Sequence, residues 1–334
     1  MQSPLPVRDG VNATRLRLPD EGPWDTAMDY MMHRWGHIDP QGIEDRFDAG
    51  EIVGEGGVPL TRHTRLEDHT FIWYYRTLPP ETRLPVEISI LHRDDHLLVV
   101  DKPHFLPTTP GGTYIQESAL VRLRNQLDLP DLIPMHRLDR MTAGVLLFST
   151  NPQTRGKYQV LFEKRQVQKD YECVSAAEPA PGHAAVEFPV VVRNRMTKSR
   201  SYLLAEVVEG EPNTETRIER LETFDAGAHP GAGGTAPAAP ALAQYRLEPH
   251  TGKTHQLRVH MASLGLGIVN DAFYPDLLDK APDNFGKPLQ LLARGIRFVD
   301  PVSGRPVEYR SGLELSEAVR ARSRAAAEAP ARTL

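Results

Sequence analysis

Two stretches of this sequence combine side chains whose types and spacing are suited to chemistry, and the first is MHRLDRMTAGVLLFST at residues 135–150. In it Asp139 lies between Arg137 and Arg140, shortly before an apolar run at residues 144–148 that is typical of a buried strand. Burying a carboxylate at the edge of a core is costly unless a partner compensates. A carboxylate that a nearby guanidinium keeps ionised can serve as a nucleophile or as a base. Asp139 is therefore the candidate catalytic residue.

The second stretch is LEPHTGKTHQLRVHMASLGLG at residues 247–267, and its pattern predicts a helix. Thr254 is a suitable N-cap and Gly265 a suitable end. The apolar residues recur at i, i+4 and i+7 and are Leu257, Met261 and Leu264. Arg258 lies beside them in the first turn, where an arginine either extends to water or pairs with a buried acid.

Three histidines of this stretch, His250, His255 and His260, raise the question of a metal site. Steps of five residues turn a helical side chain about 140° out of alignment and place strand residues on opposite faces. Cys173 is the single cysteine of the chain, which removes thiolate ligands and internal disulfides. We therefore expect no metal.

Local signals place the elements that must position these stretches. Near the N-terminus, residues 1–22 are expected to form a loose arm, residues 24–35 a helix with an apolar stripe, and residues 71–81 a strand closed by two prolines. Residues 88–112 indicate two strands around a polar turn, followed by a loop rich in proline and glycine.

Further along, Asn151 and the proline after it are a typical helix start, and residues 169–176 alternate like a strand. Residues 226–241 are rich in glycine, proline and alanine and predict a flexible surface loop. The tail beyond about residue 315 is expected to fray or to form a peripheral helix.

The composition is that of an ordinary globular protein, with 334 residues, 40% of them hydrophobic and 25% charged. No apolar run is long enough to cross a membrane and the N-terminus lacks the apolar centre of a signal peptide, so we expect a cytoplasmic protein. The net charge of −5 is uneven, because residues 155–200 carry +4 and residues 203–225 carry −5. A local basic face can attract a polyanion despite an acidic total.

Four blocks of the chain, in order, resemble the RluA-type branch of RNA pseudouridine synthases. HRLDRMTAGVLLFS is similar to that family's HRLD signature, and ILHRDDHLLVVDKP at residues 90–103 to its entry strand pair. KDYECV at residues 169–174 resembles its K-x-Y strand, and PHTGKTHQLRVHMASLG at residues 249–265 its TGRTHQIRVH helix. One departure is Leu292, which stands where the family usually has a histidine and which we interpret as a packing residue.

The resemblance implies an α+β fold with a mixed, mainly antiparallel β-sheet flanked by helices. It also implies an enzyme that isomerises specific uridines of ribosomal or transfer RNA to pseudouridine without a cofactor. It implies that Asp139 is the essential acid, that Arg258 is its partner, and that Tyr171 stacks on an extruded uridine. Arg137 would fill the gap left by the extruded nucleotide. The residues implied to bind RNA are His136, Arg137, Arg140, Lys169, Lys253, His255 and Leu257.

The implied catalytic domain spans residues 86–312, followed by a tail at residues 313–334. Residues 23–85 would form a small α+β region that faintly resembles a degraded S4-type RNA-binding module. We expect a monomer with RNA as its partner. Whether Asp139 acts as nucleophile or base, and which uridine is the substrate, stays open at this point.

Two other functions are compatible with parts of this pattern. One is an RNA-binding protein of the same fold that has lost catalysis, against which the presence of Asp139, Tyr171 and Arg258 argues. The other is a glycosidase or nucleosidase using Asp139. Such enzymes normally pair two carboxylates, and the sequence indicates no second acid near these motifs.

Overall fold

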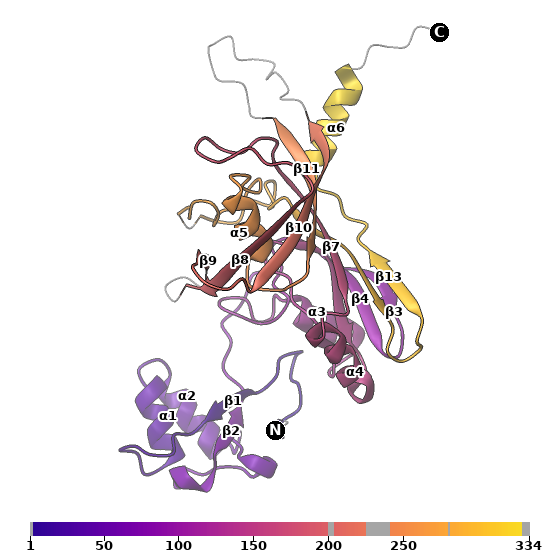
Figure 1. Cartoon of the computed structure of the whole chain (residues 1–334). Coiled ribbons are helices and arrows are strands. Elements are labelled where there is room, and N and C mark those ends of the chain that lie inside the picture. The colour runs from indigo at the N-terminus through magenta and orange to yellow at the C-terminus, as the bar shows by residue number, and fades with distance from the viewer. Residues whose placement is uncertain (1–2, 200–203, 225–240, 280, 329–334) are drawn as a thin grey trace. The chain divides into compact units, whose positions relative to one another are not determined.

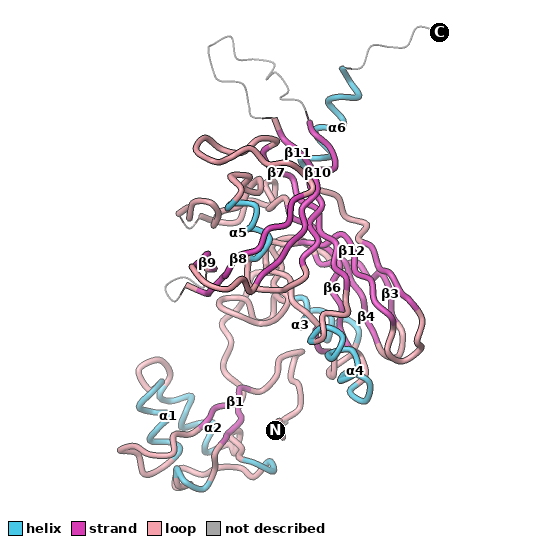
Figure 2. The backbone as a smooth tube through the Cα atoms, viewed as in Figure 1, coloured by secondary structure: helices cyan, strands magenta, loops and turns pink. Residues whose placement is uncertain are grey.

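The computed structural model describes residues 3–199, 204–224, 241–279 and 281–328, which belong to two compact units (Figures 1 and 2). The first unit comprises residues 1–82, 110–117 and 121–130, and the second comprises the rest of the chain. Apart from residue 241, the predicted flexible loop at residues 226–241 lies outside the described residues. In the described ranges, every helix is too short or too polar to cross a bilayer.

The first unit is a small α+β arrangement around its own apolar core. Its strands, helices and 3-10 turns are β1 (Thr14–Arg17), α1 (Ala27–Trp35), α2 (Pro40–Asp48), η1 (Glu55–Gly57), η2 (Leu66–Asp68) and β2 (Phe71–Tyr74), joined by most of α3 (Ala119–Leu127). β1 and β2 pair antiparallel. The expectation of a loose arm was therefore wrong for residues 14–17, which gain a ladder of backbone hydrogen bonds.

Helix α1 begins three residues later than its apolar stripe predicted. Thr26 caps it, because its hydroxyl accepts the Asp29 N–H while the Asp29 carboxylate accepts the Thr26 N–H. Trp24 lies before the helix but still packs against the core with Met31. The predicted stripe is thus a packing surface.

The second unit is built on an 11-stranded sheet, counted over the described residues. The main path runs β3 (Ser89–Arg93), β4 (Leu97–Lys102), β6 (Ala143–Ser149), β12 (Leu291–Val299), β7 (Gln168–Ala176), β11 (Leu242–Pro249), β10 (Thr214–Phe224), β8 (Val190–Lys198) and β9 (Ala205–Val208). β5 (Ile133–Pro134) pairs with β6, and β13 (Pro306–Arg310) with β12. Among these described strands β6 and β12 pair parallel and the other pairs are antiparallel, which confirms the predicted mixed, mainly antiparallel sheet.

The strand after the Asp139 loop is the apolar run that the sequence predicted. β6 is buried along its whole length between β4 and β12. Gly144 has a φ of +113°, and a Cβ at this position would lie 2.2 Å from the Ala293 carbonyl oxygen. A glycine is therefore required where β6 leaves the loop and meets β12.

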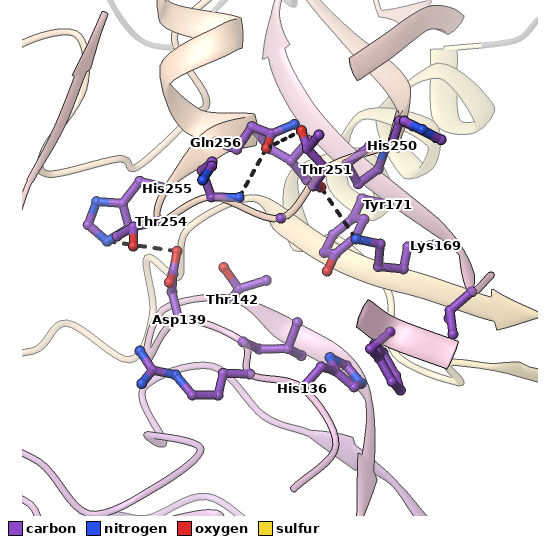
Figure 3. Close-up of a pocket in the computed structure, with 18 of the residues that line it drawn as sticks. His136, Asp139, Thr142, Lys169, Tyr171, His250, Thr251, Thr254, His255 and Gln256 are labelled. Atoms are coloured by element: carbon purple, nitrogen blue, oxygen red, sulfur yellow. Dashed lines mark hydrogen bonds and ion pairs between the residues drawn. The ribbon is translucent and has the colours of Figure 1, made fainter. Parts of the chain in front are cut away.

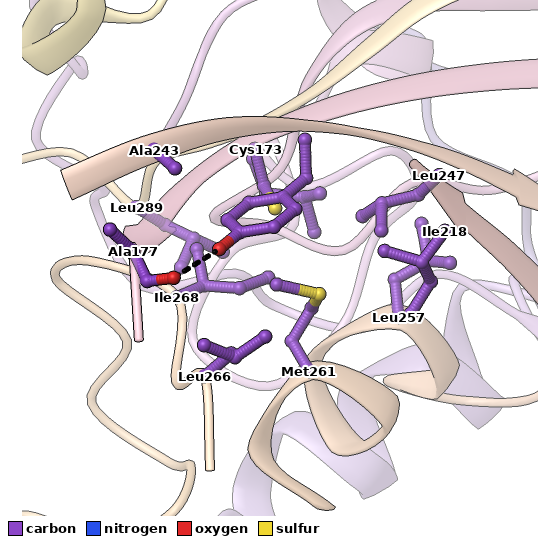
Figure 4. Packing of buried hydrophobic residues seen from close by; sticks show 12 residues of the cluster. Cys173, Ala177, Ile218, Ala243, Leu247, Leu257, Met261, Leu266, Ile268 and Leu289 are labelled. Carbon is purple, nitrogen blue, oxygen red and sulfur yellow. Dashed lines mark hydrogen bonds between the residues drawn. The ribbon is translucent and has the colours of Figure 1, made fainter. Parts of the chain in front are cut away.

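Helices cover both faces of the sheet (Figure 1). The helices of the second unit are α4 (Pro152–Glu163), α5 (Gln256–Ser263) and α6 (Ser316–Glu328). Asn151 caps α4 as predicted, and α6 is the peripheral helix that was one of the two expectations for the tail. Figure 4 shows the cluster under α5, where Met261 packs near Cys173 of β7. The next strand residue, Val174, belongs to the cluster of the opposite face, with Leu292 and α6. Leu292 is 1% exposed, so its interpretation as a packing residue is confirmed.

Candidate active site

A pocket of about 770 Å³ opens in the second unit, and both chemistry-bearing stretches line it (Figure 3). One wall is the loop before β6, another is the turn that leads into α5, and β7 passes between them. Nine of the ten predicted site residues line this pocket, and Arg140 does not. Residues far apart in the chain therefore meet where the sequence predicted a site.

The loop that carries Asp139 is held through its backbone. Three side chains of the segment 102–108 bond to carbonyl oxygens on either side of Asp139. These pairs are Thr108 with Leu138 at 2.8 Å, Lys102 with Arg140 at 3.4 Å, and His104 with Met141 at 2.6 Å. The Asp139 side chain takes no part in this anchoring and is 34% exposed. The fold thus fixes the loop and leaves the carboxylate facing the pocket.

Arg258 lies at the predicted place but has a different main partner. Its Nη1 is 3.8 Å from Asp139 Oδ2, which confirms the predicted proximity. Its hydrogen bonds go instead to Asp271, with Nε–Oδ2 at 2.7 Å and Nη2–Oδ1 at 2.5 Å. Arg258 therefore pairs with Asp139 as expected, but Asp271, which the sequence did not predict, occupies the hydrogen-bonding fork of the guanidinium.

Asp271 is also a second acid near these motifs, which the sequence pattern did not indicate. Its side chain is fully buried, and its Oδ1 additionally accepts the backbone N–H groups of Phe273 and Tyr274. The buried guanidinium therefore stands between two carboxylates, one saturated with hydrogen bonds and one open to the pocket. Because Asp271 is enclosed, it is not available as the second catalytic carboxylate of a glycosidase.

The turn before α5 differs from its prediction at the helix start. The cap residue of α5 is His255 and not Thr254, and it has a left-handed φ of +55°. Gln256 organises the turn, because its side-chain oxygen accepts from the Thr251 hydroxyl at 2.8 Å and from the Lys253 N–H at 3.1 Å. These contacts close the turn without the Thr254 hydroxyl. The predicted end of the helix at Gly265 is confirmed by its φ of +73°.

His255 and His260 make separate contacts, as their spacing predicted. His255 Nδ1 is 2.9 Å from the Tyr274 hydroxyl, and its Nε2 is 3.8 Å from Asp139 Oδ2 (Figure 3). His260 is buried against Thr216, at 2.9 Å from that hydroxyl, and burial lowers its pKa to about 4. Within the described ranges, no group of three or more histidines, cysteines or carboxylates is arranged to hold a metal.

Tyr171 of β7 presents its ring to the pocket between the two walls (Figure 3). Burial, and to a smaller extent the charge of Asp139, raises the pKa of its phenol above the usual range. The hydroxyl therefore stays protonated at neutral pH. Two residues earlier, Lys169 donates to the Thr251 carbonyl at 3.3 Å, and burial, with a smaller effect of Arg165, lowers its pKa.

The remaining predicted RNA-binding residues have different surroundings. Arg137 and Lys253 are exposed at the pocket rim. His136 accepts the Leu147 N–H at 3.2 Å, and burial lowers its pKa to about 3, so the ring is neutral. Leu257 is 8% exposed and packs in the core under α5 while also lining the pocket.

Arg140 is the predicted site residue that lies outside the pocket lining. Its guanidinium forms a two-pronged ion pair with Asp283, at 2.8 and 2.7 Å, and also donates to the Phe105 carbonyl. The sequence shows the positive charge of Arg140 next to Asp139 but not the acid, more than a hundred positions away, that neutralises it. The arrangement ties the Asp139 loop to a distant loop.

Three residues near the site were not predicted: Asp271, Tyr274 and Lys102. Lys102 is fully buried, is bonded to backbone carbonyls, and has a pKa that burial lowers to about 7. Two of them had a signal in the sequence. A buried Arg258 requires an acid, and Asp271 follows an apolar segment; Lys102 ends the apolar run of β4. No local pattern indicated Tyr274.

Comparisons with known proteins relate this chain to one family of RNA-modifying enzymes. A family model described as RNA pseudouridylate synthase matches residues 96–263. The dual-specificity RNA pseudouridine synthase RluA of Salmonella typhi is 30% identical over 227 residues, covering 67% of this chain and 92% of the relative. The pseudouridylate synthase RPUSD2 of Homo sapiens is 30% identical over 212 residues, covering 63% of this chain and 35% of the relative.

Among solved structures, human RNA pseudouridylate synthase domain containing 4 has a TM-score of 0.50 at 23% identity, covering 71% of this chain and 92% of that chain. This likeness supports the fold of the second unit. Taken with the two sequence relatives and the ordered blocks around the pocket, the family match shows that this chain belongs to the RluA-type RNA pseudouridine synthases.

Proposed function

We propose that this enzyme isomerises a uridine of ribosomal or transfer RNA to pseudouridine with Asp139 as its catalytic residue. The observation that carries the proposal is the position of Asp139, a carboxylate in the pocket with Arg258 and His255 each 3.8 Å from its Oδ2. The loop backbone is anchored independently, so the carboxylate is free to act on a substrate.

The reaction breaks the bond between C1′ and N1, turns the base and forms a bond between C1′ and C5. The C5 hydrogen leaves as a proton and N1 gains one, so electrons balance without redox chemistry. A carboxylate can promote the first step as a nucleophile or by removing a sugar proton. Arg258 places a positive charge 3.8 Å from the oxygen that would act in either role.

Two neighbours suit an extruded uridine. Stacked RNA hides the sugar bond, so the nucleotide must leave the stack, at a cost of about a few kcal/mol. The protonated phenol ring of Tyr171 provides a face for the extruded base, a contact worth roughly 1–3 kcal/mol. Arg137, which is exposed at the rim, would then occupy the vacated position.

The pocket rim also suits a polyanion. Five basic residues line the pocket besides Arg258, and they are Arg137, Arg165, Lys169, Lys198 and Lys253. Four of them come from the segment 155–200 or directly precede α5, so the basic segment and the Arg258 helix converge. Phosphate contacts would therefore outweigh the net acidic charge locally.

Release of tritium from RNA that contains C5-tritiated uridine tests the proposal, with RNA from cells that lack this enzyme as substrate. We expect release by the wild type and about 10²- to 10⁴-fold slower release by Asp139→Asn, which retains RNA binding. Asp95→Asn, a change at an exposed turn, is the matched control. Measurable product from Asp139→Asn at the wild-type rate contradicts the assignment, and RNA binding without release by the wild type would indicate the silent alternative.

A further inference from the structure

Three side chains from separate segments, Tyr274, His255 and Asp139, lie in a row that ends at Asp139. Figure 3 shows the part of the row formed by His255 and Asp139. Tyr274 follows the apolar segment after α5, His255 directly precedes α5, and Asp139 lies in the loop before β6. The Tyr274 hydroxyl is 2.9 Å from His255 Nδ1, and His255 Nε2 is 3.8 Å from Asp139 Oδ2. Each ring nitrogen of the histidine therefore has its own neighbour.

The hydrogen bonds of Tyr274 set the direction of this row. Its oxygen accepts the backbone N–H of Ala205 at 2.8 Å. The single O–H of the phenol then remains to be donated, and His255 Nδ1 at 2.9 Å is an atom that can accept it. A neutral imidazole that accepts at Nδ1 carries its proton on Nε2, the nitrogen nearest to Asp139. Burial lowers the pKa of His255, so the neutral ring prevails at neutral pH.

The backbone and neighbouring rings of His255 hold the imidazole in this place. A φ of +55° is uncommon for a residue other than glycine and is kept where the surrounding structure enforces it. The side chain caps no helix N–H, although it stands at the N-cap position of α5. The rings of Phe273 and Tyr274 lie 5.7 and 5.6 Å from the imidazole centre and flank it. The left-handed backbone of His255 therefore orients the imidazole next to Asp139 and provides no side-chain cap for α5.

We propose that His255 is a positioning residue for Asp139 and that Tyr274 fixes the tautomer in which His255 acts. The inference rests on the proposed role of Asp139. Arg258 Nη1 also comes to 3.8 Å from Oδ2, so two nitrogen atoms lie near one oxygen and together can orient the carboxylate. The present spacing is longer than a hydrogen bond, and contacts of this kind commonly shorten when substrate is bound.

This role differs measurably from direct RNA binding by His255. A residue that only contacts RNA changes the affinity, whereas a residue that orients the carboxylate changes the rate of the bound complex. Single-turnover tritium release with enzyme in excess, from C5-tritiated RNA of cells that lack the enzyme, measures that rate. RNA affinity is measured in parallel by filter binding of the same RNA.

We expect His255→Ala to slow single-turnover release about tenfold to a hundredfold, the range typical of residues that orient a reactive group, with affinity within about twofold of wild type. His255→Gln retains an N–H near the position of Nε2 and should recover most of the rate. Reduced affinity of His255→Ala with an unchanged rate would overturn the proposal in favour of an RNA contact.

Tyr274→Phe tests the link to the tautomer and serves if His255→Ala fails to fold. It should slow tritium release several-fold in the wild-type background and have no further effect in His255→Ala, because both changes interrupt the same row of contacts to Asp139. Tyr158→Phe is the matched control, since it also removes a hydroxyl bond, to Asp300 at 2.6 Å, but outside the pocket lining. If the rate reductions of Tyr274→Phe and His255→Ala instead multiply in the double variant, the proposed link from Tyr274 through His255 to Asp139 is overturned.

Asp139→Asn assayed on the same RNA separates this inference from the proposed function. Retained release by Asp139→Asn removes the catalytic assignment on which the inference rests. An inactive Asp139→Asn together with a full single-turnover rate in His255→Ala overturns the positioning role alone.

Discussion

The two aspartates beside Arg258, Asp139 and Asp271, differ in exposure and in hydrogen bonding. The loop before β6 is anchored through backbone carbonyls, and its Asp139 side chain remains 34% exposed. The wall at the start of α5 is anchored through side chains, and Asp271, which lies after α5 and outside the pocket lining, is fully buried in a two-pronged bond to Arg258 of that helix. The same guanidinium faces both acids. Hydrogen bonding and exposure, and not residue type, therefore separate the acid available for chemistry from the acid that supports the wall.

The largest expected effect is on stability, from removal of the buried acid. Asp271→Ala leaves the guanidinium of Arg258 buried without its partner, which should lower the free energy of unfolding by about 3–5 kcal/mol. Asp139→Ala, the matched control on the other wall, should lower it by less than about 1 kcal/mol. Urea denaturation measures both. Equal losses in the two variants would show that the walls do not differ as described.

The anchoring of the loop wall can be tested with acid. Burial lowers the pKa of His104 to about 4, while the unfolded chain titrates near 6.5. As the pH falls, the unfolded state therefore takes up this proton first. The free energy of unfolding is unaffected by this group above about pH 6.5 and decreases as the pH falls toward 4.

The matched variant for this test is His104→Gln, which keeps a side-chain donor near the Met141 carbonyl but does not titrate. Between pH 7 and pH 4, wild type should lose on the order of 3 kcal/mol more unfolding free energy than this variant. His136 and His260 titrate in both proteins, so their contribution cancels. Parallel pH curves would contradict a neutral, buried His104.

Tyr171 lies between the walls and should contribute through its ring. Tyr171→Ala should weaken transition-state binding by roughly 1–3 kcal/mol, whereas Tyr171→Phe keeps the stacking face and should stay within about twofold of wild-type release. The comparison of kcat/KM for the two variants measures this. A large loss in Tyr171→Phe would instead point to chemistry by the hydroxyl.

The smallest expected effect concerns the pocket rim. Lys253→Ala should weaken RNA binding modestly and reduce the slope of log affinity against log salt by about 1, as for the loss of one phosphate contact. Lys157→Ala, an exposed change on α4 away from the pocket lining, should leave the slope unchanged. Equal slopes for Lys253→Ala and wild type would remove Lys253 from the RNA surface.

Most of the elements could be predicted because their signals are local. The apolar run that became β6, the alternation of β7 and the Asn151 cap of α4 each depend on neighbours within a few residues. The start of α5 could not be predicted in the same way. Thr254 has the right chemistry for a cap, but the bonds of Gln256 to Thr251 and Lys253 close the turn differently.

The ordered motifs determined by themselves the family, the kind of sheet and nine of the ten residues predicted to meet in the pocket. The tertiary structure decided which charges pair: Arg258 with Asp271, Arg140 with Asp283, and the row from Tyr274 through His255 to Asp139. The physical reason is that periodicity and capping act over a few residues, whereas an ion pair forms between whichever charges the sheet brings within about 4 Å. The pairing of these charges is therefore a property of the folded chain.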